Sequence, residues 1–469
     1  MRRTRIVCTL GPASCTPTVL RRMISAGMDV ARLNFSHGDH ATARRLVETV
    51  RMVAAASGRH IAILQDLQGP KIRTGRLSTP TVRLARGKTL RLTSRAVVGN
   101  ESLIAVSHQE VLNALRLRDR VLLADGQIEL RVQAIDGQDA DCQVTRGGTL
   151  GERKGVAVPG RPLDMPACTE KDLEDLKLGA ELNFDYVALS FVRTAEDVRT
   201  FRRAMDVAGV KAPVVAKLER AQALHNVREI LAVVDAVMVA RGDLGVELTL
   251  GEVPAAQKDI IDQANRAGVP VITATEMLES MITSNRPTRA EASDVANAIW
   301  DGTDAVMLSQ ETSTGANPVE AVQAMARICL SAERHPSYKR EHPAWPARNS
   351  VSAAMSRAAA GVAEQVRARA IIAFTESGQT ALRVSKASPS APVIAASPHS
   401  SVLRRSALYS GVIPLQAEHG GDTDAMVANA TQAALEAGLV RHGDRVVLVA
   451  GVPVGESGQT NLVKVGTVP

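Results

Sequence analysis

Two short aliphatic runs that end in charged residues decide the fold of this chain. They are Val214-Val215-Ala216-Lys217-Leu218-Glu219 and Ala236-Val237-Met238-Val239-Ala240-Arg241-Gly242-Asp243. Continuous aliphatic runs are typical of strands that are buried on both faces of a parallel sheet. Glu219 and Asp243 lie 24 positions apart, which is the length of one strand-helix repeat. Because charge at the carboxyl ends of such strands lies at the rim of the sheet, two carboxylates and a lysine there favour a divalent metal beside an anion.

The same rhythm of strand and helix recurs along the chain. Three strands are expected in the first 73 residues, at Arg5–Thr9, Met28–Asn34 and His60–Gln65. Five more are expected after residue 163, and the polar residues that end them are Ser190, Glu219, Asp243, Thr275 and Ser309. Eight units of this kind predict an α/β fold, a TIM (β/α)8 barrel with its active site at the carboxyl face. A doubly wound sheet remains the rival, because counting strands does not distinguish the two.

The rhythm changes between about residues 74 and 163, where short alternating strands and Gly or Asp turns replace the helical period. We therefore expect a barrel built from residues 1–73 and 164–340, with residues 74–163 inserted as a small β-barrel domain. Residues 334–348 contain three prolines and are typical of a linker. Residues 349–469 begin with an Ala-rich helix and continue with strands and helices, which predicts a C-terminal α/β domain.

Composition argues against several classes of protein. The net charge of +7 and the pI near 9.3 are spread over scattered Lys and Arg, without the basic run or aromatic platform of a nucleic-acid binder. The five cysteines show no CxxC spacing, which favours reduced thiols in a cytoplasmic protein. No apolar run approaches the length that spans a bilayer, so no membrane association is expected.

Several motifs, taken together, resemble one known family. They are TRIVCTLGPAS at residues 4–14, ARLNFSHG at 31–38, VARGDLGVE at 239–247, MLESM at 277–281, RPTRAE at 286–291 and SDVAN at 293–297. In this order, and over essentially the whole chain, they resemble pyruvate kinase. The resemblance implies transfer of a phosphoryl group from phosphoenolpyruvate to ADP, giving pyruvate and ATP in the last step of glycolysis.

The resemblance also implies roles for the residues at the ends of the strands. Glu219 and Asp243 match ligands of Mg²⁺, for which Mn²⁺ is a possible replacement, and both supply the hard oxygen atoms that such ions prefer. The amides of Gly242 and Asp243 would hold the substrate carboxylate at the start of a helix. Lys217 would stabilise charge on the transferring phosphoryl group and on the enolate oxygen. Thr275 would relay the proton that turns the enolate into pyruvate.

A second set of residues matches the nucleotide and phosphate contacts of the family. Arg32 and Arg73 match arginines that grip phosphate oxygens, for which a planar guanidinium is well suited. Lys154 comes from the inserted domain and matches its contact with the nucleotide, as expected of a lid. Asn34 belongs to the same nucleotide site. His37 fits either that site or a cap on the following helix.

The monovalent-cation site departs from the family pattern. Its matching ligands are Asn34, Ser36, Asp66 and Leu67. Lys71 stands where the family commonly has an acidic residue, as in the bacterial members of the family that carry this lysine and work without K⁺. A fixed positive charge at this position can replace the ion electrostatically. We therefore expect that K⁺ is not required. Smaller departures, which bear on nucleotide affinity, are Glu276, Gln310 and Thr314.

The C-terminal domain contains a candidate site for a phosphorylated allosteric effector. The residues that resemble the family's effector loop are Thr375, Ser377, Gly378 and Thr380. Hydroxyls and a glycine at a helix N-terminus suit a phosphate, although the same pattern also fits a merely capped helix. The loop at residues 451–458 would contact the same ligand. The resemblance further implies a homotetramer.

Two other functions remain open at this point. A Mg²⁺-dependent aldolase or lyase acting on pyruvate-like enolates would also use paired carboxylates on a barrel, but it would have no use for Lys154 and a lid. A non-catalytic sugar-phosphate sensor would bind through the C-terminal domain alone. The set of Lys217, Glu219, Asp243 and Thr275 argues against that sensor.

Overall fold

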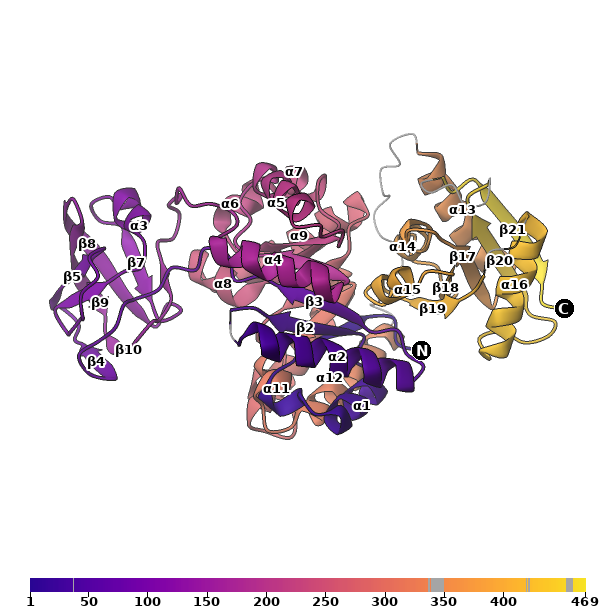
Figure 1. Ribbon diagram of the computed structural model, residues 1–469, viewed down its shortest axis with the longest axis horizontal. Coiled ribbons are helices and arrows are strands. Elements are labelled where there is room, and N and C mark those ends of the chain that lie inside the picture. Colours follow the sequence, from indigo (N-terminus) through magenta and orange to yellow (C-terminus); the bar gives the residue numbers. More distant parts are fainter. Residues whose placement is uncertain (37, 336–337, 339–349, 419, 421, 453–458) are drawn as a thin grey trace.

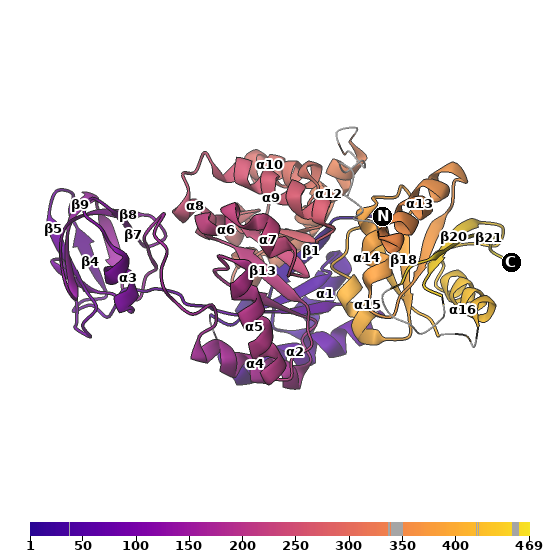
Figure 2. The same cartoon turned by 90° about the horizontal axis from the view of Figure 1, so that it is seen from above.

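Three parts follow one another along the long axis of the molecule. A computed structural model describes residues 1–36, 38–335, 338, 350–418, 420, 422–452 and 459–469. A lid made of β-strands lies at one end, a barrel in the middle and an α/β domain at the other end (Figure 1). The view from above shows the same succession, with the N-terminus between the barrel and the C-terminal domain (Figure 2).

Eight parallel strands close into the central barrel. They are β1 (Arg5–Thr9), β2 (Val30–Asn34), β3 (Ala62–Asp66), β12 (Tyr186–Leu189), β13 (Val214–Leu218), β14 (Ala236–Ala240), β15 (Val271–Ala274) and β16 (Ala305–Leu308). The ring closes because β1 pairs with β2 on one side and with β16 on the other, with Arg5 opposite Ala305. This closure confirms the predicted TIM barrel and excludes the doubly wound sheet.

Helices connect and cover these strands. They are η1 (Pro12–Ser14), α1 (Pro17–Ala26), α2 (His40–Ala56), α4 (Glu170–Leu182), α5 (Ala195–Val207), α6 (Ala221–His225), α7 (Val227–Leu231), α8 (Arg241–Glu247), α9 (Val253–Ala267), η2 (Glu279–Ile282), α10 (Arg289–Asp301), α11 (Gln310–Ser313) and α12 (Pro318–Arg334). Reciprocal capping boxes start three of the longer helices: Thr169 with Asp172 in α4, Thr194 with Asp197 in α5, and Thr288 with Glu291 in α10. Local sequence therefore determines where these helices begin.

A repeated aspartate organises the amino face of the barrel. One aspartate stands directly before every second strand, and each accepts a hydrogen bond from a backbone N–H at the start of the preceding barrel strand, over 2.7 to 2.9 Å. The four are Asp29, Asp185, Asp235 and Asp304, and their donors are Ile6, Ile63, Val214 and Val271. Each aspartate also pairs with a cation. We refer to these four residues as the aspartate ring.

The lid consists of two sheets around one aliphatic core. One sheet contains β11 (Val156–Ala157), β7 (Arg120–Leu123), β8 (Ile128–Asp136), β9 (Asp139–Arg146), β5 (Thr89–Thr93) and β6 (Leu103–Ala105), in that order, and the other pairs β10 (Gly148–Gly151) with β4 (Thr81–Leu84). These two sheets make up the inserted domain, which was expected as a small β-barrel. A short helix, α3 (Gln109–Ala114), lies where almost no helical period was predicted.

The C-terminal domain has a five-stranded sheet of mixed direction. Its strands, in order, are β19 (Val412–Gln416), β18 (Val393–Ser397), β17 (Ala370–Phe374), β20 (Arg445–Ala450) and β21 (Leu462–Thr467), of which β21 runs antiparallel. Its helices are α13 (Val351–Gln365), α14 (Gln379–Lys386), α15 (Ser400–Ser406) and α16 (Thr423–Glu436). This domain docks on the aspartate ring, where Lys386 lies 2.5 Å from Asp304 and Arg404 lies 2.8 Å from Asp185.

Membrane insertion was not expected from the sequence. Among the described residues, no helix combines the length and the apolar character that crossing a membrane requires.

Candidate active site

A buried lysine lies at the centre of the carboxyl face. Lys217, near the end of β13, has a side chain that is 12% exposed. Its Nζ donates to the Ser190 hydroxyl over 2.8 Å, and it lies 2.8 Å from Glu219 and 3.3 Å from Asp66. A lysine surrounded in this way keeps its charge at a defined point and has few accessible rotamers.

A second cation, Arg32, contacts the Asp66 carboxylate. The guanidinium of Arg32, in the middle of β2, lies 2.6 Å from Asp66 and donates to the Thr9 hydroxyl over 2.8 Å. Asp66 is 1% exposed and lies between Arg32 and Lys217. Strands β2, β3 and β13 therefore bring two cations and a buried carboxylate together, with β12 between β3 and β13.

The charges in this cluster shift one another's protonation. Burial alone would lower the pKa of Lys217, but Asp66 and Glu219 raise it above its usual value. Burial acts to raise the pKa of Asp66, but Lys217 and Arg32 hold it below the usual range. Burial raises the pKa of Glu219, and Lys217 offsets this effect only in part. The cluster therefore combines a lysine that stays charged with one carboxylate that resists protonation and one that accepts a proton more readily.

Glu219 and Asp243 line the same small cavity, of about 50 Å³, together with Lys71 and with Gly155 and Val156 of the lid. Glu219 Oε2 accepts the backbone N–H of Phe191 over 2.8 Å. The other oxygen, Oε1, is buried and accepts no hydrogen bond, since its contact with Lys217 is an ion pair without hydrogen-bond geometry.

This cavity offers oxygen ligands that suit a divalent cation. A buried oxygen without a hydrogen bond, beside a second carboxylate, is the kind of donor set that Mg²⁺ binds. In the described part of the chain, no group of three or more His, Cys, Asp or Glu is arranged around one ion position. The remaining ligands of a Mg²⁺ ion held here would therefore come from water or substrate.

Thr275 lies at the far side of the same face, directly after β15. Its hydroxyl accepts the backbone N–H of Gly242 over 2.8 Å and donates to the carbonyl of Ala274 over 2.6 Å. Gly242 and Asp243 belong to the first turn of α8, as the sequence predicted. The structure therefore joins the ends of β14 and β15 through the Thr275 hydroxyl.

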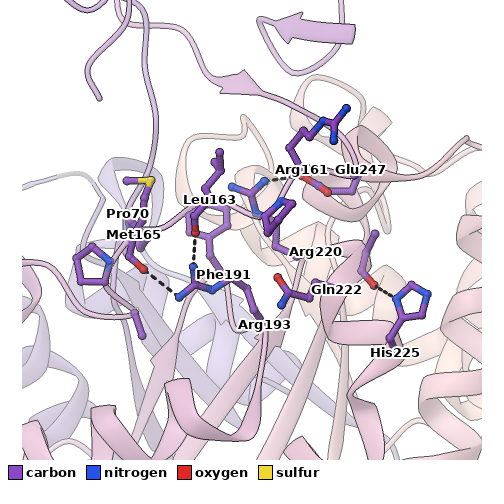
Figure 3. Close-up of a pocket in the computed structure, with 15 residues that line it drawn as sticks. Pro70, Arg161, Leu163, Met165, Phe191, Arg193, Arg220, Gln222, His225 and Glu247 are labelled. Atoms are coloured by element: carbon purple, nitrogen blue, oxygen red, sulfur yellow. Dashed lines mark hydrogen bonds and ion pairs between the residues drawn. The ribbon is translucent and has the colours of Figure 1, made fainter. Parts of the chain in front are cut away.

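A larger cavity, of about 320 Å³, lies between the barrel and the segment through which the chain returns from the lid (Figure 3). Arg193 of the barrel donates to the carbonyl oxygens of Leu163 (2.6 Å) and Met165 (2.9 Å) in that segment. Asp197 pairs with the same guanidinium over 2.9 Å. Arg193 therefore fastens the returning segment to the barrel.

The two expected basic residues of the lid connection, Arg73 and Lys154, lie on paired segments. Arg73 donates to the carbonyl of Arg153 over 3.1 Å, and its backbone is bridged to Gly155. Lys154 is exposed, and its backbone exchanges hydrogen bonds with Thr74. In the described part of the chain, the hydrogen bonds of both residues stay within the lid and its connection. His37, the remaining nucleotide candidate, lies outside the described residues.

The oxygens expected to bind K⁺ already have partners. Asn34 Oδ1 accepts the backbone N–H of Ser36 over 3.1 Å, and the Leu67 carbonyl accepts the Ser190 hydroxyl over 2.7 Å. Asp66 is shared by two cations, as described above. Lys71 forms no ion pair with any described residue and lines the cavity of Glu219 and Asp243.

The candidate effector loop brings its hydroxyls into local contacts. Thr375 Oγ1 accepts the backbone N–H of Gly378 over 2.8 Å, and Thr380 lies 3.1 Å from Thr460. Ser377 is exposed. Most of the second expected loop, residues 453–458, lies outside the described residues. The three departures Glu276, Gln310 and Thr314 are all exposed.

Two residues of the site were not predicted as such. Ser190 connects Lys217 to the Leu67 carbonyl, and the signal for it was its place at the end of a barrel strand. Arg241 contacts the backbone after β15, and nothing in the spacing of the sequence indicates that contact.

The fold and the cluster define a TIM-barrel enzyme with charged side chains gathered at the carboxyl face of the barrel. The family profile described as "Pyruvate kinase, barrel domain" matches residues 1–322, and "Pyruvate kinase, alpha/beta domain" matches residues 353–466. The chain belongs to the pyruvate kinase family and is a phosphotransferase.

Individual relatives agree with this assignment. A pyruvate kinase of Mycobacterium intracellulare is 43% identical over 99% of this chain and 98% of its own length. One from Staphylococcus aureus (strain MRSA252) is 42% identical over 99% of this chain and 80% of its own length. A crystal structure of a pyruvate kinase from Cryptosporidium parvum superposes with a TM-score of 0.92 at 36% identity, covering 100% of this chain and 96% of that one. The aldolase, lyase and sensor alternatives are not favoured.

Proposed function

We propose that this chain transfers the phosphoryl group of phosphoenolpyruvate to ADP at the carboxyl face of its barrel. The observation that carries the site assignment is Lys217, buried and charged between Asp66 and Glu219. The bond between phosphorus and the enol oxygen of the substrate breaks, and a bond to a terminal oxygen of ADP forms. The enolate that remains takes a proton on its methylene carbon and becomes pyruvate.

Each charged group has a task in this reaction. The Lys217 ammonium stabilises negative charge on the phosphoryl group in flight and on the enolate oxygen. Arg32 binds phosphate oxygens, and Asp66 keeps both cations in place. Glu219 and Asp243 would hold Mg²⁺, which when bound neutralises charge on the substrate oxygens. Asp243 binds the substrate carboxylate through its backbone amide, whereas the N–H of Gly242, which was also expected there, donates to the Thr275 hydroxyl.

Thr275 and the lid complete the proposal. The Thr275 hydroxyl passes a proton from water to the enolate, since a hydroxyl with its ordinary acidity relays a proton rather than titrating. Lid closure would bring Arg73 and Lys154 to the nucleotide, with Asn34 and His37 on the barrel side. This assignment rests on a division into barrel (1–73 and 164–340), lid (74–163) and regulatory domain (349–469).

The proposal also covers the monovalent cation. Pyruvate kinases generally require Mg²⁺ and usually K⁺. Here Asp66 already balances two cations, and Lys71 places a further positive charge at the cavity of Glu219 and Asp243. We infer that this enzyme does not require K⁺, because the lysine supplies the charge that the ion supplies elsewhere.

Steady-state kinetics test the function and the K⁺ inference together. Pyruvate formation is measured with Mg²⁺ while K⁺ replaces tetramethylammonium at constant ionic strength. We expect rapid turnover without K⁺, K⁺-stimulated turnover in Lys71→Glu, and loss of nearly all turnover in Lys217→Met. Strong stimulation of the unaltered enzyme by K⁺ would reject the role of Lys71 alone. Unchanged turnover in Lys217→Met would reject the assigned site.

The remaining parts of the proposal concern regulation and assembly. Thr375, Ser377, Gly378 and Thr380 would bind the phosphate of an allosteric effector. The chain would act as a cytoplasmic homotetramer, and its five free cysteines support a reducing compartment. Light scattering during size-exclusion chromatography tests the tetramer, and binding of phosphorylated metabolites to Thr375→Ala tests the effector loop.

A further inference from the structure

The turn that carries Thr275 has an unusual backbone. Thr275 has a φ of +68° and Glu276 a φ of +53°. Positive φ is the region that favours glycine, and it is a marked outlier for a β-branched residue such as threonine. Two successive residues in this region cost about 1–3 kcal/mol each, so surrounding contacts must hold the turn in place.

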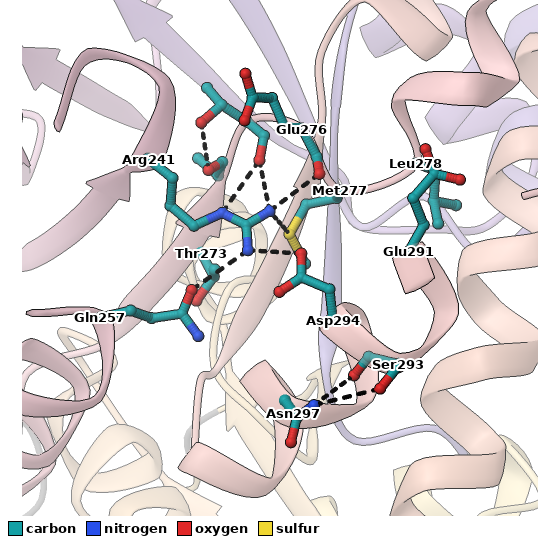
Figure 4. Close-up of polar contacts among 12 residues, drawn as sticks. Arg241, Gln257, Thr273, Glu276, Met277, Leu278, Glu291, Ser293, Asp294 and Asn297 are labelled. Atoms are coloured by element: carbon teal, nitrogen blue, oxygen red, sulfur yellow. Dashed lines mark hydrogen bonds and ion pairs between the residues drawn. The ribbon is translucent and has the colours of Figure 1, made fainter. Parts of the chain in front are cut away.

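One arginine provides those contacts (Figure 4). Arg241 donates to the carbonyl of Thr275 from Nε (3.2 Å) and from the terminal nitrogen Nη2 (2.7 Å), and to the carbonyl of Glu276 over 3.1 Å. Its other terminal nitrogen lies 2.6 Å from Asp294 and 3.4 Å from Gln257. The guanidinium is therefore fixed from α9 and α10 while it holds the turn after β15.

The Arg241 side chain is largely buried, and its contacts require the shape of a guanidinium. The Arg241 side chain is 10% exposed, whereas that of Asp294 is 38% exposed. A planar guanidinium presents several donors in one rigid plane, which is how Arg241 reaches two successive carbonyls and a carboxylate at once. A lysine in its place would keep the positive charge but supply only a single point of contact.

The backbone of this turn sets the direction of the Thr275 hydroxyl. That hydroxyl bonds to the Gly242 amide and the Ala274 carbonyl, so its direction follows from the backbone that carries it. Arg241 and Gly242 are consecutive residues of α8, and one side chain and one amide thus secure the turn from two sides. Relaxation of φ at Thr275 would move the hydroxyl away from the carboxyl face.

We infer that Arg241 is a positioning residue, which holds the strained turn at Thr275 and Glu276 and thereby aims the Thr275 hydroxyl at the reacting carbon. The inference rests on the proposed role of Thr275 as a proton relay. Arg241 itself touches no reacting atom in this proposal. Its effect is on protonation of the enolate and not on binding of the phosphate.

Arg241→Lys tests the inference, with kcat and KM for phosphoenolpyruvate measured separately. Displacement of a catalytic group by about 1 Å costs up to ~100-fold in rate. We expect kcat to fall by about 10- to 100-fold, with a much smaller change in KM. By microscopic reversibility, the same variant should exchange the methyl protons of pyruvate with D₂O more slowly, which NMR detects without any phosphoryl transfer.

A matched control and a double variant isolate the effect. Arg202 grips the carbonyl of Val233 and pairs with Asp235 in the same manner, but at the amino face of the barrel. Arg202→Lys should leave kcat and methyl exchange unchanged. In a Thr275→Ala background, Arg241→Lys should lower kcat little further, because the hydroxyl that it positions is gone.

The outcomes separate the inference from the role on which it rests. Unchanged kcat in Thr275→Ala would overturn the relay and, with it, the positioning role. A large loss in Thr275→Ala, combined with an equal further loss on adding Arg241→Lys, would overturn the positioning role alone. If Arg241→Lys does not fold, as judged by circular dichroism, then Asp294→Asn replaces it. Asp294→Asn should lower kcat by less than Arg241→Lys, and only in enzyme that retains Thr275. Full activity of Asp294→Asn would overturn the inference.

Discussion

At the scale of single residues, Lys217 lies between two carboxylates whose pKa values are shifted in opposite directions. Asp66 touches Arg32 as well as Lys217, and its pKa is lowered. Among the residues that the structure describes, Glu219 has only Lys217 as a cation in contact, and burial raises its pKa. Because a shifted pKa links protonation to folding, the two carboxylates should affect stability with opposite sign.

Substitution of each carboxylate tests that difference in enzyme free of metal and substrate. The ionised Asp66 stabilises the fold above the usual aspartate pKa of about 3.9, and this contribution is lost as pH falls through its lowered folded value. Removing one partner of a buried pair costs about 3–5 kcal/mol. We therefore expect Asp66→Asn to lower the unfolding temperature at pH 7 by roughly 10 °C, with the difference from wild type shrinking in acid.

Glu219→Gln should behave in the opposite way. Ionised Glu219 counts against the fold above its raised pKa, and that penalty disappears on acidification. The unfolding temperature of this variant at pH 7 should therefore equal or exceed that of wild type in the presence of EDTA. Thermal unfolding, monitored by circular dichroism between pH 4 and 8, tests this difference between the two carboxylates. Equal destabilisation by Asp66→Asn and Glu219→Gln would contradict the prediction.

At the scale of elements, the aspartate ring explains how strands of the barrel are joined at the amino face. Each aspartate bonds the backbone of the neighbouring strand, but its cationic partner differs. Asp304 pairs with Lys386 of the C-terminal domain, and both side chains are at most 5% exposed. Asp235 pairs with Arg202, and both are more than a third exposed. Burial lowers the pKa of Lys386, and Asp304 opposes that shift.

Because the ion pairs of the aspartate ring differ in burial, the same Asp→Asn substitution should lower stability by unequal amounts. Asp304→Asn leaves a buried ammonium unpaired and should cost about 3–5 kcal/mol. Asp235→Asn breaks an exposed pair and should cost about 1 kcal/mol. Adding Lys386→Met to Asp304→Asn should restore much of the loss, because the unpaired charge is removed. Denaturant unfolding measures all three variants, and similar losses for both aspartates would show that the domain contact is not what makes Asp304 different.

At the scale of the whole molecule, two segments connect the lid to the barrel, and Arg193 holds the one through which the chain returns. Arg193 holds the carbonyls of Leu163 and Met165, and Asp197 fixes the guanidinium. The cavity of about 320 Å³ beside this contact leaves room for the returning segment to move. Arg193 therefore ties the returning segment to the barrel at this point.

Arg193→Ala should loosen this connection without unfolding the barrel. We expect limited proteolysis to cut the segment around residues 158–168 several-fold faster, since cleavage follows local opening. The KM for ADP should rise, because the lid carries Lys154. The control is Arg91→Ala, which removes a pair with Asp141 inside the lid and should leave the cleavage rate at the connection unchanged. Equal cleavage in wild type and Arg193→Ala would mean that the fastening has no mechanical role.

The sequence by itself determined the order of the strands and the family, and it favoured a barrel over a doubly wound sheet. Aliphatic runs such as Val214–Leu218 report burial on both faces, and the capping residues mark where the helices begin, so these features are local. It also placed Lys217, Glu219, Asp243 and Thr275 at one face, because the carboxyl ends of parallel strands meet there. It missed β21, whose alternating residues pair antiparallel at the edge of the C-terminal sheet.

Only the tertiary structure decided which charges meet. Asp66 and Lys217 are far apart in sequence, and only barrel closure shows that they share an ion pair and that Ser190 joins them. The clamp from Arg241 to Thr275 likewise spans two different strand ends. Hydrogen bonds and buried ion pairs depend on ångström distances between segments remote in sequence, and periodicity along the chain carries no information about those distances.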